Sequence, residues 1–146
     1  MADNEHDLHV ALVEIFEADT GSGGLVGLTG QTYPLRRWGD RGQLDLPNST
    51  AEGIVTIFFP VISENTVKSD RVATQFDIWT APSSTGRAWK IADRIEAVVT
   101  NTALGSTARS NPVDAAPYFR TRRDLPELSE GRTRVTLEAE MWFNRS

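Results

Sequence analysis

The C-terminal end of the chain alternates apolar and polar residues more strictly than any other segment. From Thr133 to Phe143, one set of alternate positions is almost entirely apolar and the other carries Arg, Thr, Glu and Trp. A period of two over such a length is typical of a β-strand with one face buried. Arg71–Thr80 repeats this pattern, with Phe76 and Ile78 on one side and Gln75 and Asp77 on the other. We therefore expect two strands, each with one covered face and one face that is wet or contacts a partner.

The remaining segments predict two helices and three further strands. Apolar residues at spacings of three and four predict helices over residues 5–18 and 84–103. β-Branched and aromatic residues predict strands at Gly53–Phe59, at Thr32–Arg36 and at Pro117–Arg122. Pro60 should either close the first of these strands or place it near a sheet edge. Residues 21–53 are otherwise rich in Gly, Pro, Asp and Asn, which predicts a long loop or extended arm. The pattern indicates an α+β fold: a mainly antiparallel sheet of four to five strands with two helices packed on one face, plus this arm.

Length and composition exclude several classes of protein. A chain of 146 residues fits a single domain, 1–146. Without cysteine there is no disulfide scaffold, thiolate metal site or cysteine nucleophile. The acidic, polar start does not resemble a secretory signal, and no apolar run approaches the ~20 residues that span a membrane. A sequence pI near 5.0 disfavours a dedicated nucleic-acid binder. We expect a soluble domain that is made inside the cell.

The charged residues are unevenly distributed. Thirteen of the 15 basic residues are Arg, which favours protein interfaces, although a GC-rich genome would give the same bias. Residues 1–20 hold six acids and no base, whereas five arginines lie between Arg120 and Arg134. This separation suits head-to-tail contact between copies of one chain, and solvated faces are the alternative interpretation.

Each candidate for catalysis or ligand binding has a simpler explanation. His6 and His9 lie at a helix start with no third strong ligand specified nearby, so we expect no metal site. The Gly-rich Gly21–Gly24 segment lacks the Gly-Lys-Ser/Thr of a phosphate loop and is interpreted as a connector. Glu138 and Glu140 share a strand face with Arg134, where ion pairs are commoner than acid/base catalysis. We expect no catalytic residue and no cofactor.

The arm carries a different signal. Arg36, Arg37 and Trp38 combine cationic and aromatic side chains, which is typical of contact hot spots and of stacking on nucleic acid. We favour a protein partner over a solvated loop, and nucleic acid ranks third because the chain is acidic overall.

A resemblance to a known family follows from these segments taken in order. A short helix, Leu8–Phe16, leads through a Gly-rich step into Thr32-Tyr33-Pro34-Leu35. The chain then continues with five further segments: a strand ending Phe59-Pro60, the Arg-x-x-x-x-Phe-Asp-Ile-Trp strand of Arg71–Trp79, a helix from Gly86-Arg87-Ala88, Arg-Arg-Asp-Leu-Pro-Glu at Arg122–Glu127, and Thr133–Phe143. This order resembles the tail terminator, or tail-completion, proteins of long-tailed bacteriophages and phage-like gene-transfer particles. The chain departs from the family at the long Arg37–Gly53 insertion.

The resemblance implies a non-enzymatic virion assembly protein. It implies a homo-oligomeric ring, commonly a hexamer, that is assembled in the bacterial cytoplasm and becomes part of the virion tail or neck. Such a ring caps the tail tube, joins it to the head-side connector, and lets DNA pass through its lumen without specific binding; no membrane is involved. A head-side connector component is the nearest alternative, and a small-molecule-binding or enzymatic α+β domain is an alternative from another class. We expect subunit or partner contacts at Arg36, Arg37, Trp38, Arg71, Arg122, Arg123, Arg134, Glu138 and Glu140.

Overall fold

A computed structural model describes residues 4–37, 53–64, 69–81, 85–101, 113–127 and 132–144. These residues form three helices and five strands. In chain order they are α1 (Asn4–Ala18), α2 (Leu25–Thr29), β1 (Leu35–Arg37), β2 (Gly53–Glu64), β3 (Ser69–Thr80), α3 (Thr85–Asn101), β4 (Val113–Glu127) and β5 (Arg132–Asn144).

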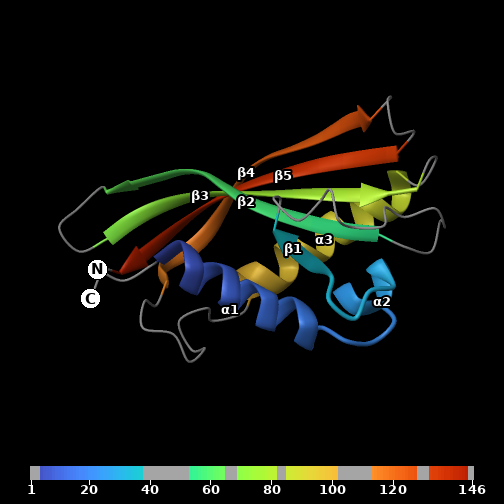
Figure 1. Cartoon of the computed structure of the whole chain (residues 1–146), viewed down its shortest axis with the longest axis horizontal. Coiled ribbons are helices and arrows are strands. Elements are labelled where there is room, and N and C mark those ends of the chain that lie inside the picture. Colours follow the sequence, from blue (N-terminus) through green and yellow to red (C-terminus); the bar gives the residue numbers. More distant parts are fainter. Residues whose placement is uncertain are drawn as a thin grey trace.

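The five strands form one sheet in the order β1-β2-β3-β5-β4 (Figure 1). The pairs β2–β3, β3–β5 and β4–β5 are antiparallel, and only β1–β2 is parallel. A parallel pair needs a crossover of about a dozen residues or more, and the chain between Arg37 and Gly53 is long enough to supply it. The α+β prediction with a mainly antiparallel sheet is therefore confirmed.

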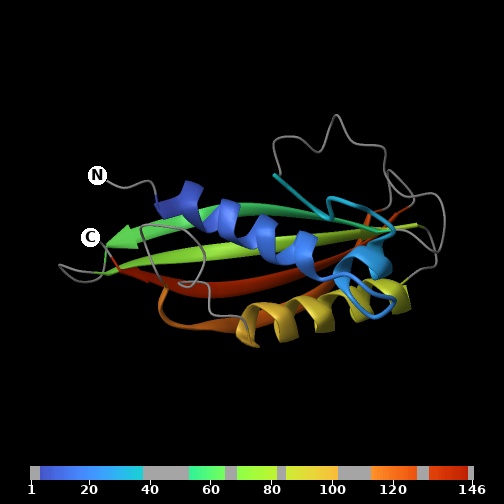
Figure 2. The ribbon, with the colours of Figure 1, turned by 90° about the horizontal axis from the view of Figure 1, so that it is seen from below.

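The helices all cover the same face of the sheet, as Figure 2 shows. The hydrophobic core lies between this helical layer and the sheet. Leu12 and Phe16 of α1 and Ile91 of α3 are fully buried, and the Phe16 ring stacks on Phe76 of β3 with centroids 5.8 Å apart. Each such side chain contributes about 1.5–3 kcal/mol to the free energy of unfolding when it is fully buried. The helical stripes that the sequence predicts are thus the ones that pack on the sheet.

Of the two outcomes predicted for Pro60, closing its strand or lying near a sheet edge, the structure shows the second. β2 continues to Glu64, and its register against β3 shifts between Phe58 and Val61. β1 pairs only with Val55–Ile57, so at Pro60 no described strand lies on the outer side of β2. Because proline is tolerated at a sheet edge and at a bulge, the strand passes through it.

The prediction of one covered and one wet face on β3 is wrong for the end of that strand. Thr74, Phe76 and Ile78 face the core as expected, but Asp77 and Trp79 on the other side are also buried. β3 is the central strand, with β2 on one side and β5 on the other. Side chains from both neighbours therefore pack around these two residues.

The prediction of a structureless segment after Gly21 is wrong where α2 forms. The predicted Thr32–Arg36 strand is present as β1, shifted by a few residues, and α3 and β5 are found close to their predicted bounds. β4 is much longer than the predicted Pro117–Arg122 strand, and it continues through Asp124–Glu127, where the sequence predicts a turn. Trp38 and the rest of the predicted arm, residues 38–52, lie outside the described residues.

Candidate functional site

The predicted contact residues are distributed over four strands. β1 carries Arg36 and Arg37, β3 carries Arg71, β4 carries Arg122 and Arg123, and β5 carries Arg134, Glu138 and Glu140. Side chains are described for Arg36, Arg134, Glu138 and Glu140.

The face of the sheet without helices brings part of this set together. Arg134, Glu138 and Glu140 alternate along β5 with the buried core residues Leu137 and Ala139, so they lie on the opposite face from the helices. Across the sheet, Arg134 pairs in register with Trp79, Glu138 with Gln75 and Glu140 with Ala73. The structure therefore gathers these three predicted contacts in one line along one strand.

A row of polar side chains crosses the middle of this face. Thr56 of β2, Asp77 of β3 and Thr136 of β5 are register partners, and all three are buried. The Thr136 hydroxyl donates to Asp77 Oδ1 at 2.7 Å, and Gln75 Nε2 lies 3.2 and 3.3 Å from the two Asp77 carboxylate oxygens. Trp79 Nε1 donates to Thr56 Oγ1 at 3.0 Å. We call Thr56, Asp77 and Thr136 the polar row; its hydrogen bonds fix the face as a rigid surface.

Two arginines of the predicted set stack on aromatic rings. The Arg134 guanidinium carbon lies 5.1 Å from the centre of the Trp79 ring, and that of Arg36 lies 5.6 Å from the centre of the Tyr33 ring. Trp79 is buried, whereas Tyr33 is 54% exposed and is the exposed large hydrophobic side chain of the described part of the chain. Cation–π pairs of this kind are worth about 0.5–2 kcal/mol, depending on how far they are desolvated. Arginine on an aromatic ring is also a composition enriched at binding hot spots.

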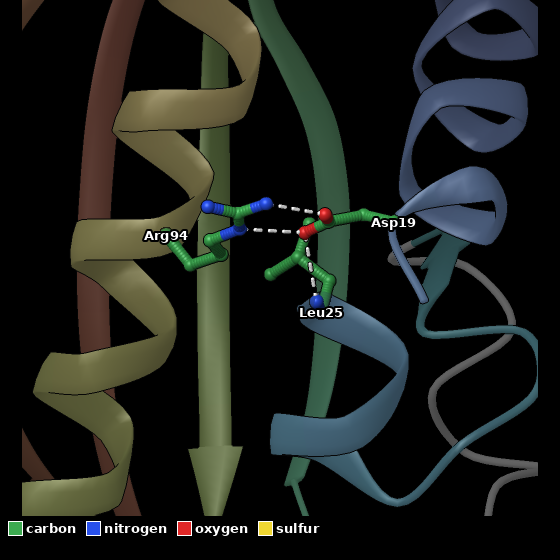
Figure 3. A network of polar contacts seen from close by, with 3 residues as sticks. All are labelled: Asp19, Leu25 and Arg94. Atoms are coloured by element: carbon green, nitrogen blue, oxygen red, sulfur yellow. Dashed lines mark hydrogen bonds and ion pairs between the residues drawn. The ribbon is translucent and has the colours of Figure 1, made fainter. Parts of the chain in front are cut away.

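Sequence reasoning missed the polar contacts that join the N-terminal helices to α3, shown in Figure 3. Arg94 of α3 binds Asp19 in a bidentate manner, with Nε 2.8 Å from Oδ2 and Nη2 2.6 Å from Oδ1. The same carboxylate accepts the backbone N–H of Leu25, the first residue of α2, at 2.8 Å. Further along α3, Arg87 Nη1 donates to the carbonyl of Leu28 at 2.9 Å. We call Asp19, Arg87 and Arg94 the α2 clamp, because they hold both ends of α2 against α3.

The α2 clamp explains how a helix of five residues persists. Isolated helices this short are unstable in water because nucleation costs more than the few hydrogen bonds return. Glycines let the segment fold tightly: a Cβ at Gly24 would collide with the Asp19 carbonyl, and one at Gly27 with the Gly21 carbonyl. Gly30 ends the helix in the left-handed region, with φ +67°. No periodic apolar pattern can reveal so short a helix, so the signals available were Asp19 and the glycines themselves.

The clamp also changes the protonation behaviour of its members. The Arg94 hydrogen bond lowers the pKa of the Asp19 carboxyl below its ordinary value of 3.8; partial burial opposes this shift, while the Leu25 amide and the charge of Arg94 add to it. The hydrogen bond from Asp19 correspondingly raises the pKa of the Arg94 guanidinium. Asp19 is thus held as the carboxylate.

The described residues give little support to metal chemistry. No group of three or more His, Cys, Asp or Glu side chains that could hold a metal occurs among them. None of the described helices is both long and apolar enough to cross a membrane.

Comparisons with known proteins give a match in structure but none in sequence. No protein-family model matches the chain, and no curated protein matches its sequence. A chain of the solved structure described as "Virion of native gene transfer agent (GTA) particle" superposes with a TM-score of 0.68 and 11% sequence identity. The match covers 98% of this chain and 99% of that chain. At this identity the likeness shows the fold, and it shows that both chains have this fold over nearly their whole lengths.

Proposed function

We propose that this chain is a non-enzymatic structural protein of a phage-like virion. The observation that supports this is the fold shared with a chain of a gene-transfer-agent virion over nearly all of both chains. If the two chains shared only one domain within otherwise unrelated proteins, much of one chain would lie outside the match. A fold alone does not determine function, so the proposal also depends on the sequence resemblance and on the surfaces described above.

Within that class we propose a tail terminator: a ring, commonly a hexamer, that caps the tail tube and contacts the head-side connector. The order of short segments from Leu8–Phe16 to Thr133–Phe143 supports this assignment. The sheet supports it too, because β1 and β4 lie at opposite edges and a closed ring can cover both without leaving an open edge. DNA would pass through the lumen of such a ring without specific binding, which suits a subunit with a net charge of -5.

The proposal assigns subunit and partner contacts to the residues predicted from the sequence. Arg134 is the best defined of those whose side chains are described, because it lies over the Trp79 ring beside the polar row. Arg36 lies at the β1 edge over the exposed Tyr33 ring. Arg37, Trp38, Arg71, Arg122, Arg123, Glu138 and Glu140 complete the set.

The direct test is the mass and shape of the purified full chain. We expect light scattering to give a mass of several 16.1 kDa subunits and negative-stain images to show rings with a central channel. The measurement is repeated with the cognate tail tube protein, because a terminator ring is expected at tube ends. A protein that remains monomeric both alone and with tubes contradicts the proposal, and a ring that binds the connector but never a tube end favours the head-side alternative.

A single charge reversal tests the contact set. Arg134→Glu is expected to weaken ring formation while the circular dichroism spectrum stays unchanged, because it reverses a half-exposed charge beside Trp79. Lys90→Glu is the matched control, since Lys90 is exposed on α3 and outside the contact set. Rings formed equally well by both variants would remove Arg134 from the interface.

A further inference from the structure

The two long sides of the subunit consist of different strands and helices. The strand order places β1 and β2 at one side of the sheet and β4 at the other. Figure 2 shows α1 on the β1–β2 side, while α3 runs along the β5–β4 side. A contact from one side of a subunit to the other side of the next is head-to-tail, which is the geometry that generates a ring.

The acidic charge of the chain is concentrated on the α1 side. Residues 1–20 carry six acids and no base, whereas residues 21–146 carry 14 acids and 15 bases. The whole negative excess therefore belongs to α1 and its immediate flanks. Glu14 is exposed and Glu17 half-buried near the C-terminal end of α1, where the helix dipole disfavours negative charge and where α1 has no basic residue.

The middle of β4 carries basic residues on an open edge, with Asp114 towards one end of the strand and Asp124 and Glu127 towards the other. β4 spans 15 residues, and in the described part of the chain no strand pairs with its outer side. Natural proteins do not leave long edges uncovered without protection, because free N–H and C=O groups there recruit other chains. The middle of β4, residues 115–123, carries three arginines, Arg120, Arg122 and Arg123, and no acid.

We propose that α1 of one copy docks along the Arg-bearing middle of β4 of a second copy, head to tail. This inference rests on the proposed ring and specifies its subunit interface. The partner is a second copy because the complementary charges lie on opposite sides of the same subunit, so each copy offers both halves of the contact. On the opposite side, the free edge consists of the three residues of β1 and the part of β2 beyond Ile57, which contains Pro60 and a register shift. Because proline has no N–H to donate and such an edge is interrupted, we assign α1 rather than a strand to the β4 edge.

The test uses two charge-reversed variants, each of which should form rings poorly alone but should form them when the two are mixed. The first, Glu14→Lys/Glu17→Lys, makes the α1 side basic. The second, Arg120→Glu/Arg123→Glu, makes the middle of β4 acidic; Arg122 is left unchanged because its register partner Leu137 belongs to the core. We expect each variant alone to be folded by circular dichroism but at least tenfold weaker in ring formation. An equimolar mixture should restore rings that contain both variants alternately, because every contact is again between opposite charges.

Each outcome decides the inference. Rings formed by either variant alone as well as by the unchanged protein overturn it, as does a mixture of folded variants that fails to assemble. If the unchanged protein forms no ring even with tail tubes, the proposed function fails; if it forms rings that are indifferent to these changes, only the α1–β4 contact fails.

The absence of cysteine permits a second, independent measurement. Glu14→Cys and Arg123→Cys are introduced into separate chains, which are mixed and oxidised. We expect disulfide-linked pairs that join the two different variants. Pairs that form only between identical variants indicate a two-fold symmetric contact and overturn the proposal. Lys90→Cys serves as the control, with no cross-link to Arg123→Cys expected.

Discussion

Asp19 and Asp77 are both carboxylates with little exposure, and the fold satisfies them with different partners. Asp19 lies between α1 and α2 and pairs with the arginine of α3 and with a backbone amide. Asp77 lies in the central strand, and its described hydrogen bonds come from the neutral side chains of Thr136 and Gln75. The Asp19 pair is close to solvent, since the Arg94 side chain is 40% exposed, whereas Asp77 is 1% exposed. We therefore expect the loss of the buried acceptor Asp77 to lower the free energy of unfolding more than the loss of the charged pair of Asp19 near the surface.

The strongest way to test this comparison is Asp77→Ala. The substitution leaves the Thr136 hydroxyl and the Gln75 amide without their acceptor in a buried place, and we expect the free energy of unfolding to fall by about 3 kcal/mol. Urea unfolding followed by tryptophan fluorescence measures it. Asp77→Asn should restore part of the loss, because an amide oxygen can still accept from Thr136. Asp93→Ala, on the exposed side of α3, is the control; a similar urea midpoint for Asp77→Ala and Asp93→Ala would mean that the polar row contributes nothing.

The matching change at the other carboxylate is Asp19→Ala, for which we expect a loss of about 1–2 kcal/mol, the usual cost of losing a helix-capping carboxylate. Asp19→Asn should cost less, since its oxygen can still accept the Leu25 amide. Hydrogen exchange locates the effect: the Leu28 and Gly30 amides, which close the turns of α2, should lose protection in Asp19→Ala while core amides of β3 keep theirs. Loss of protection throughout the molecule would show that the clamp is not local.

A pH titration sharpens the same comparison. The pKa of Asp19 is lower in the folded protein than its ordinary value of 3.8, so its stabilisation is fully present above that value and is lost as pH falls through the folded pKa. We therefore expect the difference in unfolding free energy between the unchanged protein and Asp19→Asn to be constant near neutral pH and to shrink below about pH 4. A difference that grows on acidification would contradict the assigned direction.

The smallest effect on stability is expected at the exposed arginine–aromatic pair. Tyr33→Ala should change the free energy of unfolding by less than about 0.5 kcal/mol, because surface substitutions rarely do more. Ring formation measured on the same sample then reports whether the Tyr33–Arg36 pair contributes to assembly. Normal rings with Tyr33→Ala would weaken the assignment of Arg36 as a contact.

The fold was predictable wherever a periodic pattern ran long enough to be read. α1, α3, β3 and β5 each present a continuous face to one core, and their residues repeat at the helical or strand period. The sequence left open whether Pro60 closes its strand or lies near an edge, because that depends on which strands are its neighbours, and this is a property of the whole sheet. The helix after Gly21 was not predicted because α2 is stabilised by residues of α3, which are distant in sequence. The residues of the segment itself do not reveal that contact.

The candidate site was predictable only in part, for a related reason. Alternation along β5 correctly placed Arg134, Glu138 and Glu140 on one face, away from the core. The burial of Asp77 and Trp79 was not visible, because a period of two marks which side a residue faces and not whether that side is covered. The Arg134–Trp79 pair joins residues from different segments, and spacing within one segment cannot reveal it.

The α2 clamp also affects the order in which parts of the chain can fold during synthesis. Residues 4–30 are synthesised early, but the Leu28 carbonyl of α2 is bound by Arg87, 59 positions away in sequence. Asp19, which binds the first amide of α2, is itself bound by Arg94, 75 positions away. Until Arg87 and Arg94 have been added, the Gly-rich segment has only local hydrogen bonds, such as that from the Leu25 amide to Asp19. Contacts of such long range are closed late, since the entropy of the intervening loop must be overcome first. We therefore expect α2 and α1 to reach their final positions only after α3 has been synthesised, when the C-terminal half of the domain is being completed.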